Sequence, residues 1–280
     1  MRTNYILKRN MKRVLFTVAV LLVVVVSLFP IYWVILTSFK YQRDFMSSPP
    51  VYFTTALTLE HYITAFKMWN TGPYIIHSLV ISLIATFLIV LLSVPAAYAI
   101  SKYQIGGAKL NTWMVFQRML PPAVVIIPVY LIFSKLNILD TYIGMALPYL
   151  IFQIPFAILM LIGFFSDIPQ SLQEAAMVDG CTEIQSLVKI ILPLVLPGIV
   201  VVILFSFVFV WNDMLIALAL SRQNTQTIVM LVAASMQQLT GTFFGMAAAM
   251  ASFSIIPIFV ITIFTQKHLV RGMTMGGVKG

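Results

Sequence analysis

The sequence predicts an all-α integral membrane protein with six transmembrane helices and a structured loop between the fourth and fifth. Three observations predict this class: the composition, a series of long uncharged stretches, and one short acidic segment. Of the 280 residues, 61% are hydrophobic and 9% are charged, against roughly 45 to 50% and 25% in soluble domains. A soluble core cannot absorb so many apolar side chains, and the length leaves no room for a second ordinary domain. The sequence therefore indicates a single membrane domain.

Six charge-poor stretches are long enough to cross a bilayer, which requires about 20 helical residues. The first, residues 14–39, is too long for a cleaved secretory signal and lacks a small-x-small cleavage site, so we expect it to remain as an anchor. The other five are expected at about 74–100, 110–133, 141–165, 192–210 and 246–265. The chain then consists of an N-terminal tail (1–13), a six-span domain (14–265) and a C-terminal tail (266–280).

The distribution of Lys and Arg predicts that both termini lie in the cytoplasm, because positively charged loops resist translocation. An even number of spans places the termini on the same side. In this orientation eleven basic residues fall on the cytoplasmic side and five on the other, with Arg118 inside a span. The segment between spans four and five, about 166–191, is then cytoplasmic too.

The charge and the cysteine count exclude several classes. The net charge of +9 comes from basic residues spread between apolar runs, which suits anionic lipid headgroups, and we expect no nucleic-acid partner. Cys181 is the only cysteine, so no internal disulfide can form and no second sulfur is present for a metal site. We expect no metal site, and Cys181 is interpreted as a small buried thiol.

The segment 166–191, here called the hook, holds four of the eight acidic residues, Asp167, Glu174, Asp179 and Glu183. An amphipathic helix on the membrane surface would bring these carboxylates against anionic lipid, which is unfavourable. A protein partner is therefore the favoured interpretation of the hook.

The hook sequence predicts two short helices separated by a bend. Ser171 followed by Glu174 fits a capping box that starts the first helix, and Thr182 followed by Gln185 fits one that starts the second. Gly180 lies between them and can end the first helix in a left-handed turn. The prediction is a helix, a bend and a second helix, anchored at both ends by spans.

The hook also resembles the EAA loop of binding-protein-dependent ABC importers. The matching residues are Glu174, Ala175, Ala176, Asp179, Gly180, Ile190, Leu192 and Pro193. The pattern is specific when it falls between the fourth and fifth of six spans. The resemblance implies that this coupling-helix loop docks into a cleft on a cytoplasmic ATPase subunit. It also implies that the loop transmits the closure of the ATPase subunit to the membrane helices. The implied coupling residues are Glu174, Ala175, Ala176, Asp179 and Gly180.

Other segments resemble the carbohydrate-uptake permeases of the maltose type. They are QRMLPPAVVIIPVY, LDTYIGMALPYL, the pair Trp211 and Asn212 in span five, and the tail QKHLVRGMTMGGVKG. The resemblance implies a bacterial or archaeal cytoplasmic-membrane protein and an extracytoplasmic solute-binding protein that contacts residues 223–243. It also implies that the tail reaches between the ATPase subunits through Gly276, Gly277 and Lys279.

The chain lacks a GxxxxGK[ST] phosphate loop, so ATP and Mg are expected on a dimer of partner ATPase subunits, with no cofactor on this chain. Its two halves do not look like repeats, so a second membrane permease subunit is expected to complete the pathway as a heterodimer. The predicted function is transport, not catalysis: half of a pathway for a sugar or oligosaccharide. The alternative is a polyol, glycerol phosphate or uronate oligosaccharide.

Three residues are candidates for the transport pathway: Arg118, Trp211 and Asn212. Arg118 is the only basic residue inside a predicted span, where a charge is costly. Arg118 either faces the pathway or caps the helix carbonyls that the prolines at 121 and 122 leave free. We expect Arg118 and Asp213 to lie at different depths in the membrane, too far apart to pair. Trp211 either offers a ring to a sugar or belongs to an interfacial belt.

Overall fold

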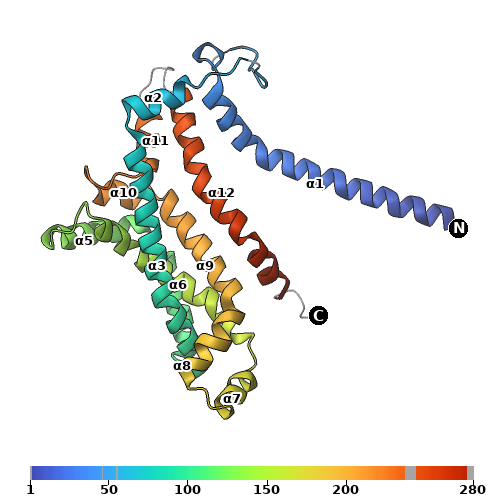
Figure 1. The fold of residues 1–280 in the computed structure, drawn as a ribbon, viewed down its shortest axis with the longest axis vertical. Helices are drawn as coiled ribbons and strands as arrows, with labels where there is room; N and C mark the ends of the chain where they lie inside the picture. Colours follow the sequence, from blue (N-terminus) through green and yellow to red (C-terminus); the bar gives the residue numbers. More distant parts are fainter. Residues whose placement is uncertain (1, 46, 55, 237–243, 276–280) are drawn as a thin grey trace. The chain divides into compact units, whose positions relative to one another are not determined.

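The computed structural model describes residues 2–45, 47–54, 56–236 and 244–275 (Figure 1). By its internal contacts the chain divides into two compact units, Thr71–Leu231 with Ser254–Gly280, and Met1–Asn70 with Val232–Phe253. All regular secondary structure in the described ranges is helical, which confirms the predicted all-α class. Among these residues five helices are long and apolar enough to cross a membrane, or six when one bent pair counts as a span.

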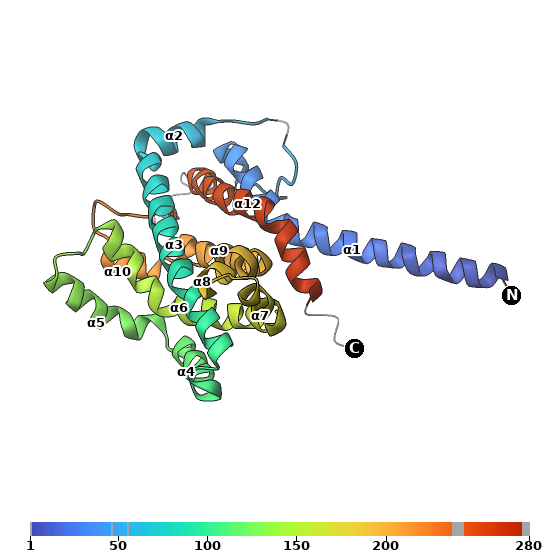
Figure 2. The ribbon, with the colours of Figure 1, turned by 60° about the horizontal axis from the view of Figure 1, so that its bottom comes forward.

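The core of the larger unit is formed by three long helices, α3 (Thr71–Tyr103), α6 (Tyr142–Ser166) and α9 (Leu192–Asn212), which lie side by side (Figures 1 and 2). α3 follows α6 in parallel along its length. His77 meets Tyr142 at one end, with ring centroids 5.9 Å apart, and the hydroxyl oxygens of Ser101 and Ser166 lie 3.3 Å apart at the other. The two helices are therefore in contact at both ends of their shared length.

Gly198 permits the close approach of α9 to α6. A Cβ atom at this position would lie 2.5 Å from the ring of Phe164, far inside van der Waals contact. Helices in a membrane gain little from the hydrophobic effect when they associate, so small residues that let backbones approach are characteristic of their interfaces. Gly198 is such a residue.

The predicted third span, 110–133, is wrong as a single helix. The structure has two helices there, α4 (Gly107–Met119) and α5 (Pro122–Lys135), bent by 86° (Figure 2). Leu120 and Pro121 between them adopt extended backbone conformations. The reason is local, because proline lacks a donor N–H and forces the residue before it out of the helical region.

The hook forms α7 (Gln170–Val178) and α8 (Glu183–Ser186), and α8 runs through a short π-helix (Leu187–Ile191) directly into α9. The predicted second helix is therefore not a separate element but the start of the fifth span. Movement of the hook can reach α9 through one continuous helix.

One of the two predicted caps in the hook is confirmed and the other is wrong. Thr182 and Gln185 form the predicted capping box at the start of α8. The proposed box of Ser171 and Glu174 is absent, because α7 begins at Gln170 with Pro169 at the cap position, two residues before Ser171. Ser171 therefore lies inside the first turn of α7, and no side chain caps this helix start.

The smaller unit contains α1 (Arg2–Phe39), a 3₁₀ turn (Gln42–Asp44), α2 (Glu60–Met68) and residues 244–253 of α12 (Phe244–Met275). A Cβ atom on Gly245 would lie 2.4 Å from the His61 ring, so glycine is required for this packing. His61 also contacts the carbonyl oxygen of Lys40 at 2.8 Å through Nε2. Helices α10 (Leu215–Leu220) and α11 (Ile228–Met236) precede α12.

Candidate functional site

The hook turns sharply at Gly180, as the sequence predicts. Gly180 has a φ of +88°, the left-handed region that favours glycine. The N–H of Cys181 donates to the carbonyl of Ala176 at 3.0 Å, and the N–H of Gly180 donates to that of Met177 at 3.1 Å. This pair of bonds is the Schellman motif, which satisfies the last carbonyls of a helix. The turn fixes the direction in which the chain enters α8.

The exposed side of α7 combines one carboxylate with apolar groups. Glu174 and Ala175 are exposed, Met177 is half-exposed, and Val178 is 88% exposed; Ile184 in α8 is 74% exposed. These five residues are called the hook surface below. Glu174 and Val178 are one turn apart and share a helix face. The opposite face packs inward.

The buried face of α7 is carried by Gln173 and Ala176. Of the implied coupling residues, Ala176 therefore belongs to the packed side of the helix, whereas Glu174, Ala175, Asp179 and Gly180 are exposed. Large apolar side chains exposed beside a carboxylate are typical of a protein-binding surface. The hook surface is available to a partner.

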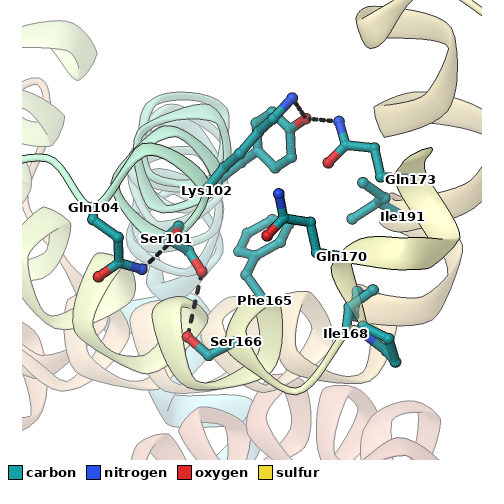
Figure 3. Close-up of a pocket in the computed structure, with 11 residues that line it drawn as sticks. Ser101, Lys102, Gln104, Phe165, Ser166, Ile168, Gln170, Gln173 and Ile191 are labelled. Carbon is teal, nitrogen blue, oxygen red and sulfur yellow. Dashed lines mark hydrogen bonds between the residues drawn. The ribbon is translucent and has the colours of Figure 1, made fainter. Parts of the chain in front are cut away.

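A polar cluster joins the hook to the end of α3. Glu183 accepts from Lys102 Nζ at 2.6 Å, from the hydroxyl of Tyr98 at 3.5 Å, and from the hydroxyl of Tyr103. Gln173 of α7 donates from Nε2 to the Tyr98 hydroxyl at 2.5 Å, and Lys102 donates to the same oxygen at 3.2 Å (Figure 3). Both hook helices are therefore tied to the last two turns of α3. These five residues are called the α3 joint.

A pocket of about 470 Å³ lies beside the α3 joint (Figure 3). It is lined by the ends of α3 and α6 and the start of α7, with Ser101, Phe165, Ser166, Gln170 and Gln173 among its walls. Its lining is polar but, apart from Lys102, uncharged. The pocket is therefore an open space between α7 of the hook and the ends of α3 and α6.

Comparison with known proteins identifies the family. Residues 89–275 match the family model described as "Binding-protein-dependent transport system inner membrane component". The chain belongs to this family. The match begins in α3 and includes the hook, and hence the α3 joint that connects them.

Related permeases match over nearly the whole chain. The permease is 32% identical over 253 residues to the diacetylchitobiose uptake system permease protein DasC of Streptomyces coelicolor, covering 90% of this chain and 92% of that one. It is 31% identical to the sulfoquinovosyl glycerol transport system permease protein SmoH of Agrobacterium fabrum, with 94% and 93% covered. In fold it matches a solved bacterial ABC transporter involved in alginate import, with a TM-score of 0.76, 20% identity, and 93% and 97% covered.

Arg118 is exposed near the end of α4, and its guanidinium lies 4.1 Å from the centroid of the Phe156 ring. Within the described ranges it makes no hydrogen bond or ion pair, so the predicted capping of broken-helix carbonyls is not formed. Asp213 instead accepts from the Tyr149 hydroxyl at 3.2 Å and from the Ile216 N–H at 2.8 Å. Arg118 and Asp213 do not pair, as the sequence predicts.

The Trp211 side chain is buried in the structure. Its side chain is 1% exposed, stacks on Phe207, and donates from Nε1 to the Ser254 carbonyl at 3.1 Å. It is a packing residue within its unit of the permease. Asn212 beside it is exposed, with Nδ2 donating to the Val208 carbonyl at 2.8 Å.

Sequence reasoning missed Asp140. Its carboxylate accepts from the backbone N–H groups of Arg222, Gln223, Asn224 and Thr225, and from the last two side chains, at distances of 2.7 to 3.2 Å. Partial burial disfavours the charge, but these bonds outweigh it and lower the pKa of Asp140 to about 2. Asp140 has a φ of +57°, and because aspartate tolerates this conformation, the sequence could have suggested a turn here. Its hydrogen-bond partners lie about 80 residues away, and no local sequence pattern indicates them.

The predicted tail contacts, Gly276, Gly277 and Lys279, lie outside the described residues, as does the 237–243 part of the predicted outer loop. Cys181 is half-buried rather than fully buried. In the described residues no group of three or more His, Cys, Asp or Glu side chains forms a metal-binding cluster.

Proposed function

We propose that this permease forms half of a membrane pathway for a sugar or oligosaccharide, and that a separate ATPase subunit drives it by docking on the hook surface. The second half is a second permease subunit, and a solute-binding protein delivers the solute from outside. ATP and Mg belong to the dimer of ATPase subunits.

The observation that carries the proposal is the hook surface. Val178 and Ile184 expose most of their apolar area at a turn held rigid by Gly180 and the Thr182 cap. When a partner covers apolar side chains of this size, their removal from water contributes favourably to the free energy of binding. Glu174 adds a charge that a basic residue in a docking cleft can pair, which gives the contact specificity.

A charge-reversal variant tests the docking. An exposed ion pair contributes about 0 to 1 kcal/mol, whereas removing one partner of a pair buried in a cleft costs about 2 to 5 kcal/mol. Glu174→Lys is therefore expected to weaken binding of the ATPase subunit roughly 30-fold or more. The measurement is co-purification followed by titration of the ATPase subunit. Glu60→Lys, an exposed acid on α2, is the matched control, and equal binding by both variants would refute docking on the hook.

The orientation is part of the same proposal. Both termini and the hook lie in the cytoplasm, and the tail contacts the ATPase dimer through Gly276, Gly277 and Lys279. A cysteine placed at the exposed Ser171, in a chain carrying Cys181→Ser, is expected to resist an impermeant thiol reagent in intact cells and to react in inverted vesicles. Labelling in intact cells would overturn this orientation.

The names of the relatives support a saccharide as the solute. The acidic alternative, such as a uronate oligosaccharide, is favoured by one observation: the exposed guanidinium of Arg118 makes no ion pair among the described residues. Uptake measured with a neutral and an acidic oligosaccharide of equal length separates the two readings. Preference for the acidic one that disappears in Arg118→Gln would support the alternative.

A further inference from the structure

We propose that the α3 joint, centred on the ion pair of Lys102 and Glu183, carries the movement of the hook to α3. The inference rests on the proposed function, because it assumes that the ATPase subunit moves the hook. In this account Lys102 and Glu183 are positioning residues, and neither touches the solute or the nucleotide.

The need for such a joint follows from the chain connections. The hook continues into α9 through one helix. α3 has no such connection, since Lys102 and Glu183 are 81 residues apart in the sequence. Any displacement of the hook reaches α3 through non-covalent contacts. The α3 joint supplies such contacts at the end of α3 that faces the hook; Figure 3 shows the two that involve Lys102 and Gln173.

The geometry of the joint suits a rigid connection. Tyr98, Lys102 and Tyr103 lie within two turns of α3, and all three approach the same Glu183 oxygen. The Tyr98 hydroxyl is also held by Gln173 of α7, and both of these residues are more than nine-tenths buried. Because α7 and α8 bind the same group of side chains, the two hook helices cannot separate without breaking a hydrogen bond of the α3 joint.

Glu183 differs in this respect from the other acids of the hook. Asp167, Glu174 and Asp179 are exposed. Glu183 pairs with Lys102 within the chain, and no other hook acid makes an ion pair in the described part of the structure. Glu174 and Glu183 therefore have separate roles: Glu174 belongs to the hook surface, and Glu183, although partly exposed, binds α3.

The connection continues from α3 to α6. Ser101, one residue before Lys102, contacts Ser166 at the end of α6, and α3 packs along α6 to its far end. A displacement of the hook thus reaches α6 and α9 through the chain itself and α3 through the α3 joint. Breaking the joint is expected to leave the hook connected to α6 and α9 but not to α3.

Charge reversal with rescue tests the inference. Lys102→Glu, Glu183→Lys and the double exchange are prepared in the complete complex with permease partner, ATPase subunits and solute-binding protein. Each single variant is expected to retain ATPase binding. Solute uptake per ATP hydrolysed is expected to fall roughly five-fold or more, the lower end of the effects typical of coupling between two sites. The double exchange restores the opposite charges and is expected to recover most of the loss. Asp167→Lys, an exposed acid of the same loop, is the charge-matched control, and Lys102→Arg is the conservative variant that keeps the pair.

The outcomes are separable. Unchanged uptake per ATP in both single variants overturns the inference, as does a defect that the double exchange fails to repair. Loss of ATPase binding in Glu183→Lys also overturns it, because Glu183 would then belong to the docking surface. If the wild-type chain itself binds no ATPase subunit, the proposed function fails instead.

Discussion

Replacing Asp140 is expected to release the chain segment that follows α10. In the structure one carboxylate holds four consecutive backbone N–H groups, those of residues 222–225. The lowered pKa measures the preference for the charged form: the change from 3.8 to about 2 corresponds to at most about 2.5 kcal/mol at roughly 1.4 kcal/mol per pKa unit. Asp140→Asn keeps the size of the side chain and one acceptor oxygen and loses the charge, and solvent screens this partly exposed carboxylate, so the free energy at risk is about 1 to 2 kcal/mol.

Hydrogen exchange at neutral pH is the direct assay. A loss of about 1 to 2 kcal/mol predicts roughly 5- to 30-fold faster exchange of the amides of residues 222–225 if they open locally. The sign of the pH dependence follows from the lowered pKa. The stabilisation is fully present above pH 3.8 and is lost as the pH falls toward 2. The difference between wild type and Asp140→Asn should therefore shrink below pH 3.8.

Asp44→Asn is the matched control for Asp140→Asn. Asp44 pairs with Arg43 at 3.7 Å, and the Arg43 side chain is 77% exposed, so its loss is expected to cost less than about 1 kcal/mol. Equal protection of residues 222–225 in wild type and Asp140→Asn at pH 7 would refute the reasoning. A faster exchange that is spread evenly over the chain would refute the local role.

Three further changes have defined outcomes. Gly180→Val places a β-branched residue at positive φ with open space around it, so about 1 to 3 kcal/mol of backbone strain should misdirect α8. The variant should reach the membrane but lose uptake. Asparagine tolerates this conformation, so Gly180→Asn should retain uptake. Arg118→Ala should lower uptake while complex assembly, measured by co-purification, is unchanged; loss of assembly would instead indicate a structural role over Phe156. Deleting the last six residues should lower uptake per ATP hydrolysed, and an unchanged ratio would count against tail contact with the ATPase dimer.

The sequence alone determined the features that depend on local chemistry. The apolar lengths predict the spans because a bilayer requires about 20 helical residues, and the family match and the helical fold agree with them. Thr182 with Gln185 and Gly180 identify a helix start and a left-handed turn because each acts on backbone groups within five residues. The same local reasoning failed at Ser171 because Pro169 provided a competing start for α7.

The tertiary structure decided everything that joins distant parts of the chain. The prolines in the third span predict a kink, but the 86° angle between α4 and α5 is not a property of those residues alone. The burial of Trp211, the clamp on Asp140 and the pairing of Lys102 with Glu183 each bring together residues more than 40 positions apart. A carboxylate carries the same sequence signal whether it faces a partner, as Glu174 does in our proposal, or binds another helix of its own chain, as Glu183 does. The direction of a side chain is set by the packing of the helices around it, and a single sequence does not specify that packing.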